Sequence, residues 1–357
     1  MTPVAIRAGE HSYNAFVGAN LLEGIGSRIA KKLHGPSCAI ISDTNVAPLF
    51  ANRVKQSLTS AGFQPALITI PAGEQSKTLE QAGAICDEMI AASLDRQSFV
   101  VGLGGGMIGD LSGFVAAIFE RGIPHVQIPT TLLAMVDSSI GGKTAVNTRA
   151  GKNLIGAFHH PALVIDDIDV LQTLPRRELN QGFAEIIKHA IIADAEMFSD
   201  LEKQRASDAL ALRSLIRRNI EIKARFVAKD QFDRTGERAL LNFGHTIGHA
   251  IERAGNYREF LHGEAISLGM VAACVISMKK AGLPQNQRAA IVDLLSQFDL
   301  PTRLPANFPR EKILEALEFD KKFENKKVRF VVASEIGSAR LTNDVTMDDL
   351  REAVEEL

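Results

Sequence analysis

Three histidines, His245, His249 and His262, lie close together in one mostly apolar segment of this 357-residue chain. His245 and His249 are four positions apart, so both side chains lie on one face if the segment is helical. His262 follows one loop later, at the expected start of a second apolar helix. Imidazole is the commonest metal ligand, and a catalytic zinc takes three protein ligands and keeps one position open. Two or more of these histidines with one carboxylate would make such a site, although spacing alone does not identify which of them bind.

Each of these histidines has an alternative role as a hydrogen-bonded core residue, the usual role of a single histidine on an apolar helix. Three of the chain's nine histidines fall in this short segment, however, and glycines that allow close approach flank them. We therefore favour a metal site. In the expected helix Glu178–Lys203, Glu185 and Lys188 are three positions apart on one face. They form a surface ion pair, which contributes little, unless the metal needs the carboxylate.

A second candidate site is the glycine-rich stretch Gly104–Asp110, which follows an expected strand and precedes an expected helix. Its glycines match the pattern GxGxxG, which lets the backbone approach a pyrophosphate at a helix N-terminus. A glycine-rich turn required only for packing is the alternative. The loop follows the third strand of an alternation, and no acid lies about twenty residues downstream to bind a ribose, so the ordinary Rossmann pattern is incomplete. Asp43, at the end of the first of these strands, is the better ribose ligand. We predict a dinucleotide site on a variant sheet.

Two lysines lie in glycine-rich turns further along, Lys143 in Gly-Gly-Lys-Thr and Lys152 in Gly-Lys-Asn. The first sequence matches the end of a P-loop. The first glycine of that motif would have to be residue 137, which is Asp, so a P-loop is excluded. As point charges the lysines suit a bound phosphate or carboxylate. Hydroxyl and amide side chains surround these lysines. A binding site and solvated surface lysines are therefore equally favoured interpretations.

The bulk composition excludes several classes of protein. Apolar residues make up 46% of the chain and charged residues 23%, and 40 basic residues face 42 acidic ones, so there is no general attraction to nucleic acid or membrane. Cys38, Cys86 and Cys274 are scattered and indicate buried thiols in a reducing compartment. The first residues lack the apolar region of a signal peptide, and the longest apolar run, Ala265–Met278, is too short to span a bilayer. We expect a cytoplasmic protein.

The elements that must position these residues alternate between strand and helix in the first half of the chain, after an opening hairpin (Val4–Ile6 and Tyr13–Val17). This alternation predicts an α/β N-terminal domain with a mostly parallel, Rossmann-like sheet over residues 1–175. The expected strands are Cys38–Ser42, Ala66–Ile70, Phe99–Leu103, His125–Ile128 and Leu163–Asp166. The expected helices are Val46–Ala61, Thr78–Ser93 and Ile108–Phe119.

From Pro175 onward the pattern becomes mainly α-helical, which predicts a second domain over residues 176–357 that binds metal and substrate. The expected helices are Glu178–Lys203, Ala206–Lys229, Ala239–Ala254, Glu264–Ala281, Gln287–Phe298 and Arg310–Phe319. A late hairpin, Val328–Ser334 and Ser338–Leu341, interrupts them.

The motifs GGGMIGDLSGF, RGIPHVQIPTTLLAMVDSSIGGKTAVN, GKNLIGAF, AEIIKH, LNFGHTIGHAIE and LHGEA follow one another in this chain. In this order they closely resemble 3-dehydroquinate synthase, of the sugar phosphate cyclase superfamily. The resemblance runs from Ser42–Leu49 to residues 320–322 and the hairpin Phe330–Leu341. It implies a homodimeric, cytoplasmic lyase of the shikimate pathway, which leads to chorismate and the aromatic amino acids.

The resemblance also implies the residues of the site. A divalent metal, zinc or cobalt, would be bound by Glu185, His245 and His262. NAD would lie along Asp43, Gly73, Glu74, Gln75, Lys77, Gly106, Met107, Ile108, Gly109, Asp110, Thr130, Thr131, Lys143, Lys152, Val170, Leu171, Gln172 and Thr173. Substrate and catalysis would involve Arg121, Lys143, Lys152, Asn153, Lys188, Lys223, Arg238, Asn242 and His249.

The implied reaction converts 3-deoxy-D-arabino-heptulosonate 7-phosphate to 3-dehydroquinate and phosphate. It proceeds by transient NAD oxidation at C5, β-elimination of phosphate, re-reduction, ring opening and intramolecular aldol closure. The chain departs from the family at His160 and Gln231, where Gln and Glu are usual, and lacks a Tyr usual near His189; none of these removes a ligand. Three alternatives remain: another sugar phosphate cyclase, a metal- and NAD-dependent polyol dehydrogenase, and an inactive nucleotide-binding module.

Overall fold

The computed structural model describes residues 2–203, 209–319, 323–324 and 327–357. The chain forms two compact units. Unit 1 runs to Leu174 and includes Ile216–Ala228, and unit 2 consists of Pro175–Leu215 and Lys229–Leu357. The long helix α7 (Ala209–Lys229) therefore contributes to both units, which a single division near residue 175 does not anticipate.

Unit 1 is built on a seven-stranded, mostly parallel sheet with the order β1-β2-β9-β6-β5-β3-β4. An antiparallel hairpin, β1 (Val4–Ala8) and β2 (His11–Gly18), opens the chain, and β2 then pairs in parallel with β9. The opening hairpin and the strand–helix alternation predicted from sequence are confirmed. The other strands are β3 (Ser37–Asp43), β4 (Gln64–Ile70), β5 (Phe99–Gly104), β6 (His125–Pro129) and β9 (Leu163–Asp167).

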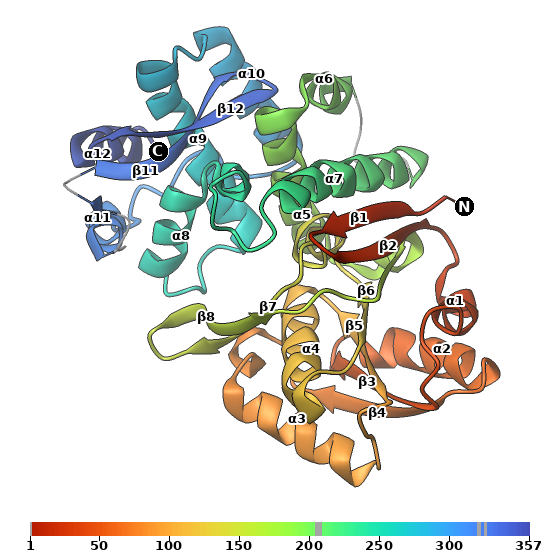
Figure 1. Ribbon diagram of the computed structural model, residues 1–357. Coiled ribbons are helices and arrows are strands. Elements are labelled where there is room, and N and C mark those ends of the chain that lie inside the picture. Colours follow the sequence, from red (N-terminus) through yellow and green to blue (C-terminus); the bar gives the residue numbers. More distant parts are fainter. Residues whose placement is uncertain (1, 204–208, 320–322, 325–326) are drawn as a thin grey trace. The chain divides into compact units, whose positions relative to one another are not determined.

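Helices cover both faces of this sheet, which is why its central strands, β3, β5, β6 and β9, are almost continuously buried and do not alternate. Every residue of β5 is buried. On one face, Ile41 and Val100 pack with Ile85 of α3 and Leu111 of α4. The helices of unit 1 are α1 (Ile25–Ile29), α2 (Ala47–Ser60), α3 (Leu79–Ala91) and α4 (Gly106–Ile118) (Figure 1).

The order of the strands produces a switch point between β3 and β5. From β3 the chain moves outward to β4 and then returns to the other side of β3 with β5. Ligands of such sheets bind beyond the carboxyl ends of the strands at this crevice. The glycine-rich loop therefore lies beside the end of β3 although it follows the third strand of the alternation.

The sequence interpretation missed a second hairpin in unit 1, β7 (Lys143–Thr148) with β8 (Gly151–Phe158). The region was expected to contain glycine-rich turns, whereas the two strands form a separate two-stranded sheet. At Gly156 a Cβ atom would lie 2.2 Å from the carbonyl oxygen of Thr144, so glycine is needed inside this strand.

Unit 2 is mainly helical, with a small antiparallel sheet. Its helices are α5 (Arg176–Ala193), α6 (Ala195–Lys203), α8 (His245–Ala254), α9 (His262–Ala281), α10 (Gln285–Gln297), α11 (Arg310–Phe319) and α12 (Met347–Glu355), with one short helical turn, η6 (Arg238–Asn242). The sheet contains β10 (Phe323–Glu324), β11 (Lys327–Glu335) and β12 (Ser338–Val345), so the predicted late hairpin is confirmed. Among the described residues, no helix is long and apolar enough to cross a membrane.

Two predicted helices of unit 2 were wrong in extent. The helix expected over Glu178–Lys203 is broken at Asp194, whose carboxylate accepts the N–H of Met197 and so starts α6. The helix expected over Ala239–Ala254 is interrupted at Gly244, which is left-handed at φ +78°. A Cβ there would lie 2.7 Å from the backbone nitrogen of Met270. The expected start of α7 at Ala206 and the family motif at 320–322 lie outside the described residues.

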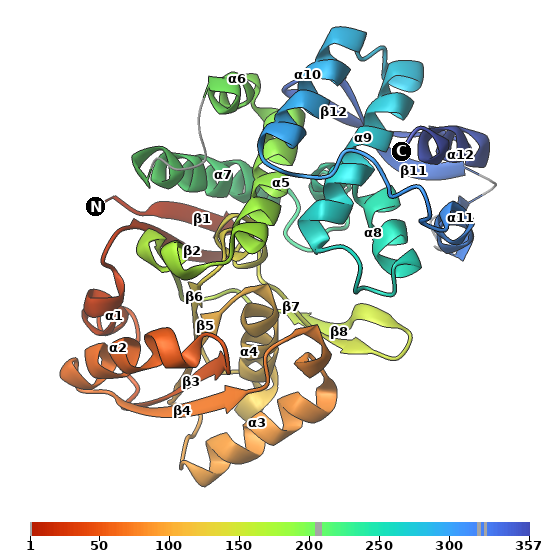
Figure 2. The same cartoon turned by 180° about the vertical axis from the view of Figure 1, so that it is seen from behind.

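Helices α8 and α9 pack closely, and this contact positions the histidines. They lie side by side in both views (Figure 1 and Figure 2). A Cβ on Gly269 would lie 2.0 Å from the carbonyl oxygen of Gly244, so only glycine allows this approach. The helices run antiparallel, with Gly244 beside Gly269 and Gly248 beside Ala265, and the rings of His245 and His262 lie with their centroids 5.6 Å apart.

Candidate active site

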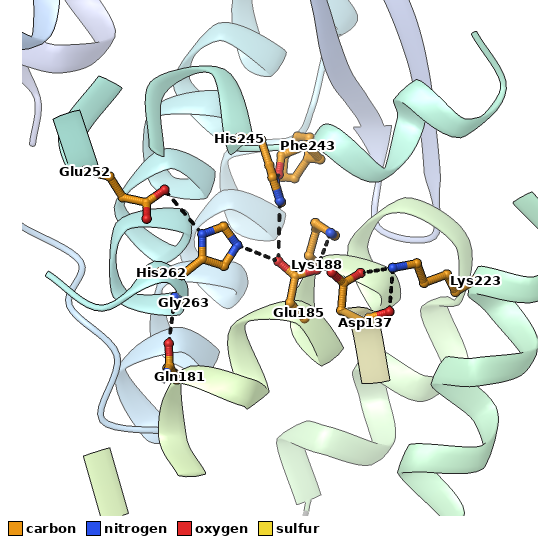
Figure 3. Close-up of polar contacts among 10 residues, drawn as sticks. All are labelled: Asp137, Gln181, Glu185, Lys188, Lys223, Phe243, His245, Glu252, His262 and Gly263. Atoms are coloured by element: carbon orange, nitrogen blue, oxygen red, sulfur yellow. Dashed lines mark hydrogen bonds and ion pairs between the residues drawn. The ribbon is translucent and has the colours of Figure 1, made fainter. Parts of the chain in front are cut away.

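Unit 2 brings one carboxylate and two imidazoles to a common point. Glu185 Oε1 lies 3.5 Å from His245 Nε2 and 3.8 Å from His262 Nε2. Figure 3 shows both rings directed at this oxygen. In a tetrahedral zinc site with bonds of about 2.0–2.2 Å, ligand atoms lie roughly 3.3–3.6 Å apart. The spacing of these three atoms is therefore close to what a divalent cation requires.

The burial and hydrogen bonding of Glu185 support this use. Its side chain is fully buried, and Oε1 has no hydrogen-bond partner among the described residues. A buried carboxylate oxygen without a donor is costly unless a cation satisfies it. Lys188 donates to the other oxygen, Oε2, and is itself only 1% exposed. This pair is thus buried, in contrast to the surface ion pair considered from the sequence.

The outer nitrogens of both histidines have acceptors, which directs the inner ones toward Glu185. His245 Nδ1 lies 3.2 Å from the carbonyl oxygen of Phe243, and His262 Nδ1 lies 3.3 Å from Glu252 Oε2. A proton on each Nδ1 satisfies these acceptors and leaves each Nε2 lone pair available, as in most protein metal sites. Burial, together with the nearby Lys188, His249 and His262, holds the pKa of His245 well below its usual value, so the ring is neutral.

Packing at the start of α9 fixes the position of His262. Glu264 accepts the N–H of Leu261 at 2.8 Å and pairs with Arg177. A Cβ on Gly263 would lie 2.1 Å from the carbonyl oxygen of Gln181, so α9 begins in direct contact with α5, which carries Glu185.

His249 is placed differently from the other two histidines. It is exposed, and its ring centroid is 5.2 Å from that of His245 and 6.0 Å from that of His262. With Glu252 and His262 it forms a second group of ligand-type atoms. This group uses the outer side of His262, whereas the group with Glu185 has the unpartnered buried oxygen and is better suited to a cation.

The remaining predicted residues of unit 2 lie in and around η6. Arg238 is buried and Asn242 is exposed. The carboxylate of Asp230 accepts backbone N–H groups from residues 234–236 and 238 and so shapes the loop that holds Arg238. Although burial opposes ionisation, these donors hold the pKa of Asp230 well below its usual value.

In unit 1, the predicted nucleotide residues gather beyond the carboxyl ends of the parallel strands. Asp43 is the last residue of β3, Gly73–Lys77 follow β4, and Gly106–Asp110 begin α4 after β5. Thr130 and Thr131 follow β6, and Val170–Thr173 lie in a helical turn after β9. Parallel strands place all of these at one edge. The N-terminus of α4 has no side-chain cap among the described residues, so its N–H groups suit an anion.

Not every side chain at this edge points toward a ligand. Val170 and Leu171 are buried in the core, so only their backbone could contact a nucleotide. Asp43 Oδ1 accepts the N–H groups of Asn45 and Val46, which leaves Oδ2 for a ribose. Lys77 is 3% exposed, and its Nζ donates to Asp110 Oδ2 at 2.5 Å and to Asn153 Oδ1 at 2.6 Å.

Two further predicted lysines lie in the β7–β8 hairpin, and a third lies in α7. Lys143 is exposed at the start of β7, and Lys152 is half-buried in β8. Lys223 Nζ donates to Asp137, to its backbone oxygen at 2.7 Å and to its carboxylate at 2.5 Å. Sequence analysis had considered residue 137 only to exclude a P-loop.

Arg121 is separated from these groups within unit 1. It follows the last residue of α4, whereas the glycine loop begins that helix, and 13 helical residues span about 18 Å. Arg121 is exposed and left-handed, at φ +69°. The fold of unit 1 therefore does not bring it to the nucleotide edge of the same chain.

Sequence reasoning missed two residues that the geometry singles out, Glu252 and Asp137. Glu252 is seven positions after His245 and three after His249, which is a helical spacing that could have identified it. Asp137 lies in the motif with Lys143 but gave no signal of its own, because its contact with Lys223 spans 86 positions.

These features define an α/β enzyme with a candidate dinucleotide edge in one unit and a candidate metal centre in the other. Family models for the 3-dehydroquinate synthase N-terminal and C-terminal regions match residues 67–181 and 182–323. A 3-dehydroquinate synthase of Desulforamulus reducens is 44% identical over 354 residues, 98% of each chain. The chain belongs to the 3-dehydroquinate synthase family.

Solved structures of sugar phosphate cyclases share the fold. A 2-deoxy-scyllo-inosose synthase complexed with carbaglucose-6-phosphate, NAD+ and Co2+ has a TM-score of 0.90 at 26% identity, and 99% of each chain is covered. A 2-epi-5-epi-valiolone synthase of Streptomyces hygroscopicus with NAD+ and Zn2+ bound has a TM-score of 0.86 at 29% identity, with 98% of each covered. The predicted fold class is thereby confirmed.

Proposed function

We propose that the chain converts 3-deoxy-D-arabino-heptulosonate 7-phosphate to 3-dehydroquinate and phosphate, as a carbon–oxygen lyase of the shikimate pathway. Membership of the family over almost the full chain supports the activity. The observation that carries the proposal is the buried, unpartnered Glu185 Oε1 facing the Nε2 atoms of His245 and His262.

The residues present fit NAD and a divalent cation, zinc or cobalt, both of which are bound in related structures. We assign the cation to Glu185, His245 and His262, and NAD to the edge formed by Asp43, Gly73–Lys77, Gly106–Asp110, Thr130–Thr131 and residues 170–173, with Lys143 and Lys152. When bound, the cation would polarise the C5 oxygen, while NAD would take up a hydride from C5 and return it.

The side chains of this chain supply restraint and charge. The substrate is flexible and carries a phosphate and a carboxylate, which Lys152, Lys188, Lys223 and Arg238 would hold as fixed cations, with Asn153 and Asn242 as neutral partners. In the elimination, the C6 proton leaves as the bond between C7 and the phosphate oxygen breaks. The departing phosphate would take this proton while His249 hydrogen-bonds to it. Holding the reacting groups in place is the main contribution of these residues.

The domain division, location and assembly belong to the same proposal. Residues 1–175 would bind NAD and residues 176–357 metal and substrate, in a cytoplasmic protein; the buried free thiols of Cys38 and Cys274 suit a reducing compartment. We further propose a homodimer. The position of Arg121, far from the nucleotide edge of its own unit, suits a residue that a second copy would supply.

The test is a coupled assay of phosphate and 3-dehydroquinate production, with and without a chelator. The proposal expects both products in equal amounts, no net NADH, and loss of activity with chelator. Net NADH on simple polyols would instead indicate a dehydrogenase, and phosphate release from a different sugar phosphate alone would indicate another cyclase. Absence of any bound zinc or cobalt would favour an inactive module.

A further inference from the structure

Asn147 lies at an irregularity of the β7–β8 hairpin. The paired residues are Val146 with Ile155 and then Thr148 with Gly151, so the register shifts across Asn147. The additional residues, 152–154, belong to β8 and lie opposite the single residue Asn147, and such a bulge re-aims the side chains around it. The backbone N–H of Asn147 donates to the carbonyl oxygen of Lys77 at 2.8 Å, and the hairpin there forms a bridge with Thr78.

The Asn147 side chain connects the same hairpin to two functional segments. Its Nδ2 donates to Glu74 Oε1 at 2.8 Å and lies 3.4 Å from the backbone oxygen of Glu74. Its Oδ1 accepts the N–H of Asn153 at 3.0 Å. One half-buried amide therefore satisfies a donor from β8 and an acceptor from the loop after β4.

Asn147 contacts Glu74 and Asn153, which the proposed function assigns to NAD and to substrate. Asn153 is left-handed, at φ +57°, a conformation that costs a non-glycine residue energy unless neighbours stabilise it. In this conformation Asn153 Oδ1 receives Lys77 Nζ, which also binds Asp110 in α4. The chain of contacts thus links the β7–β8 hairpin, the loop after β4 and the first turns of α4, all within unit 1.

We propose that Asn147 is a positioning residue, which sets the geometry of Glu74 and Lys77 for the nucleotide and of Asn153 for the substrate. This inference rests on the proposed function, because the ligands are those of that reaction. Asn147 need not touch either ligand.

The test changes the hydrogen bond between Asn147 and Glu74, first by removing its donor and then by supplying a donor from position 74. Asn147→Asp keeps the acceptor for Asn153 but places a carboxylate against Glu74. Loss of one net hydrogen bond of about 1 kcal/mol corresponds to a roughly fivefold rise in the Kd for NAD, measured by calorimetry with NAD alone. The double variant Asn147→Asp with Glu74→Gln restores a donor opposite an acceptor and should bind NAD more tightly than Asn147→Asp. Asn256→Asp, an exposed site in unit 2, controls for the added charge.

A structural role alone would lower the melting temperature and leave the Kd for NAD unchanged. An NAD Kd within twofold of wild type in both Asn147→Asp and Asn147→Ala, or additive effects in the double variant, would overturn the inference, as would wild-type protein that does not bind NAD. Activity separates the two proposals. Wild-type protein that binds NAD but releases no phosphate would contradict the proposed function, while the comparison of NAD affinities would still decide the role of Asn147.

Discussion

Glu252 provides the sharpest test of how the candidate metal centre is built. Its Oε2 lies 3.3 Å from Nδ1 of His262, it is 5% exposed, and it is outside the group formed by Glu185, His245 and His262. If this assignment is right, Glu252 acts through His262 by keeping the ring proton on Nδ1. We predict that replacing it weakens zinc binding without abolishing it.

The size of the effect follows from what each substitution leaves in place. Gln at 252 still offers a carbonyl oxygen to Nδ1 and loses only the negative charge, whereas Ala removes this acceptor from a half-buried ring. Substitutions of such outer residues cost about 10- to 100-fold in metal affinity, or about 1.4–2.7 kcal/mol. We expect Glu252→Gln near the lower figure and Glu252→Ala near the upper one.

The assay is competition with a chromogenic chelator at fixed pH, which gives the Kd for zinc directly. Glu259→Gln, at an exposed acid in the preceding loop, is the matched control and should bind zinc as wild type does. Glu185→Gln should raise the Kd for zinc far more than Glu252→Gln does. If Glu252→Gln raises the Kd for zinc more than Glu185→Gln does, the cation is bound by His249, Glu252 and His262, and the assignment to Glu185 is refuted.

Three further predictions concern His262, Lys188 and His125. His262→Ala should abolish metal-dependent turnover yet leave the Kd for NAD, measured by calorimetry, within about twofold, because His262 belongs to unit 2 and the residues assigned to NAD belong to unit 1; unchanged turnover would remove it from the ligand set. Lys188→Met leaves the buried Glu185 carboxylate unpaired, so the metal-free protein should lose about 3–5 kcal/mol in denaturant unfolding, part of which zinc restores; equal losses with and without zinc would contradict this. Burial, with His159 and His160 nearby, holds the pKa of His125 well below 6.5, so unfolding takes up a proton and stability falls as the pH drops below about 6.5. That loss should reach up to about 2 kcal/mol at pH 5, at about 1.4 kcal/mol per pH unit, and His125→Phe should flatten the pH profile of unfolding; an unchanged profile would show that another group is responsible.

The sheet and its ligand edge were predictable because the information is local. Continuous apolar runs such as Phe99–Leu103 predict strands covered on both faces, and a glycine loop between strand and helix predicts an anion site. The strand order was not predictable, since the pairing of β5 with β3 depends on packing across the whole sheet. That order explains why the loop after the third strand is the one at the switch point.

The β7–β8 hairpin shows where sequence information was insufficient. Its pairing depends on a bulge at Asn147 and on contacts to Glu74 and Lys77, about 70 positions away, which no local pattern encodes. The break between α5 and α6 is a smaller case, because Asp194 became recognisable as a cap only once its carboxylate was seen to accept the N–H of Met197. At the candidate metal centre, spacing singled out a group of three histidines but not which of them bind, because the direction of the His245 and His262 rings depends on Phe243 and Glu252.

The charges around Glu185 predict that removing Lys188 and removing Glu252 change the affinity for zinc in opposite directions. The charges of Glu185 and Lys188 cancel, and the ring of His245 is neutral, so these buried side chains would leave the full charge of a bound divalent cation to act on a substrate oxygen. Lys188 would do this by competing with the cation for the Glu185 carboxylate. Removing Lys188 should therefore tighten zinc binding while it lowers turnover, whereas removing Glu252 should weaken zinc binding. If both substitutions weaken zinc binding equally, Lys188 only supports the structure and does not adjust the charge of the site.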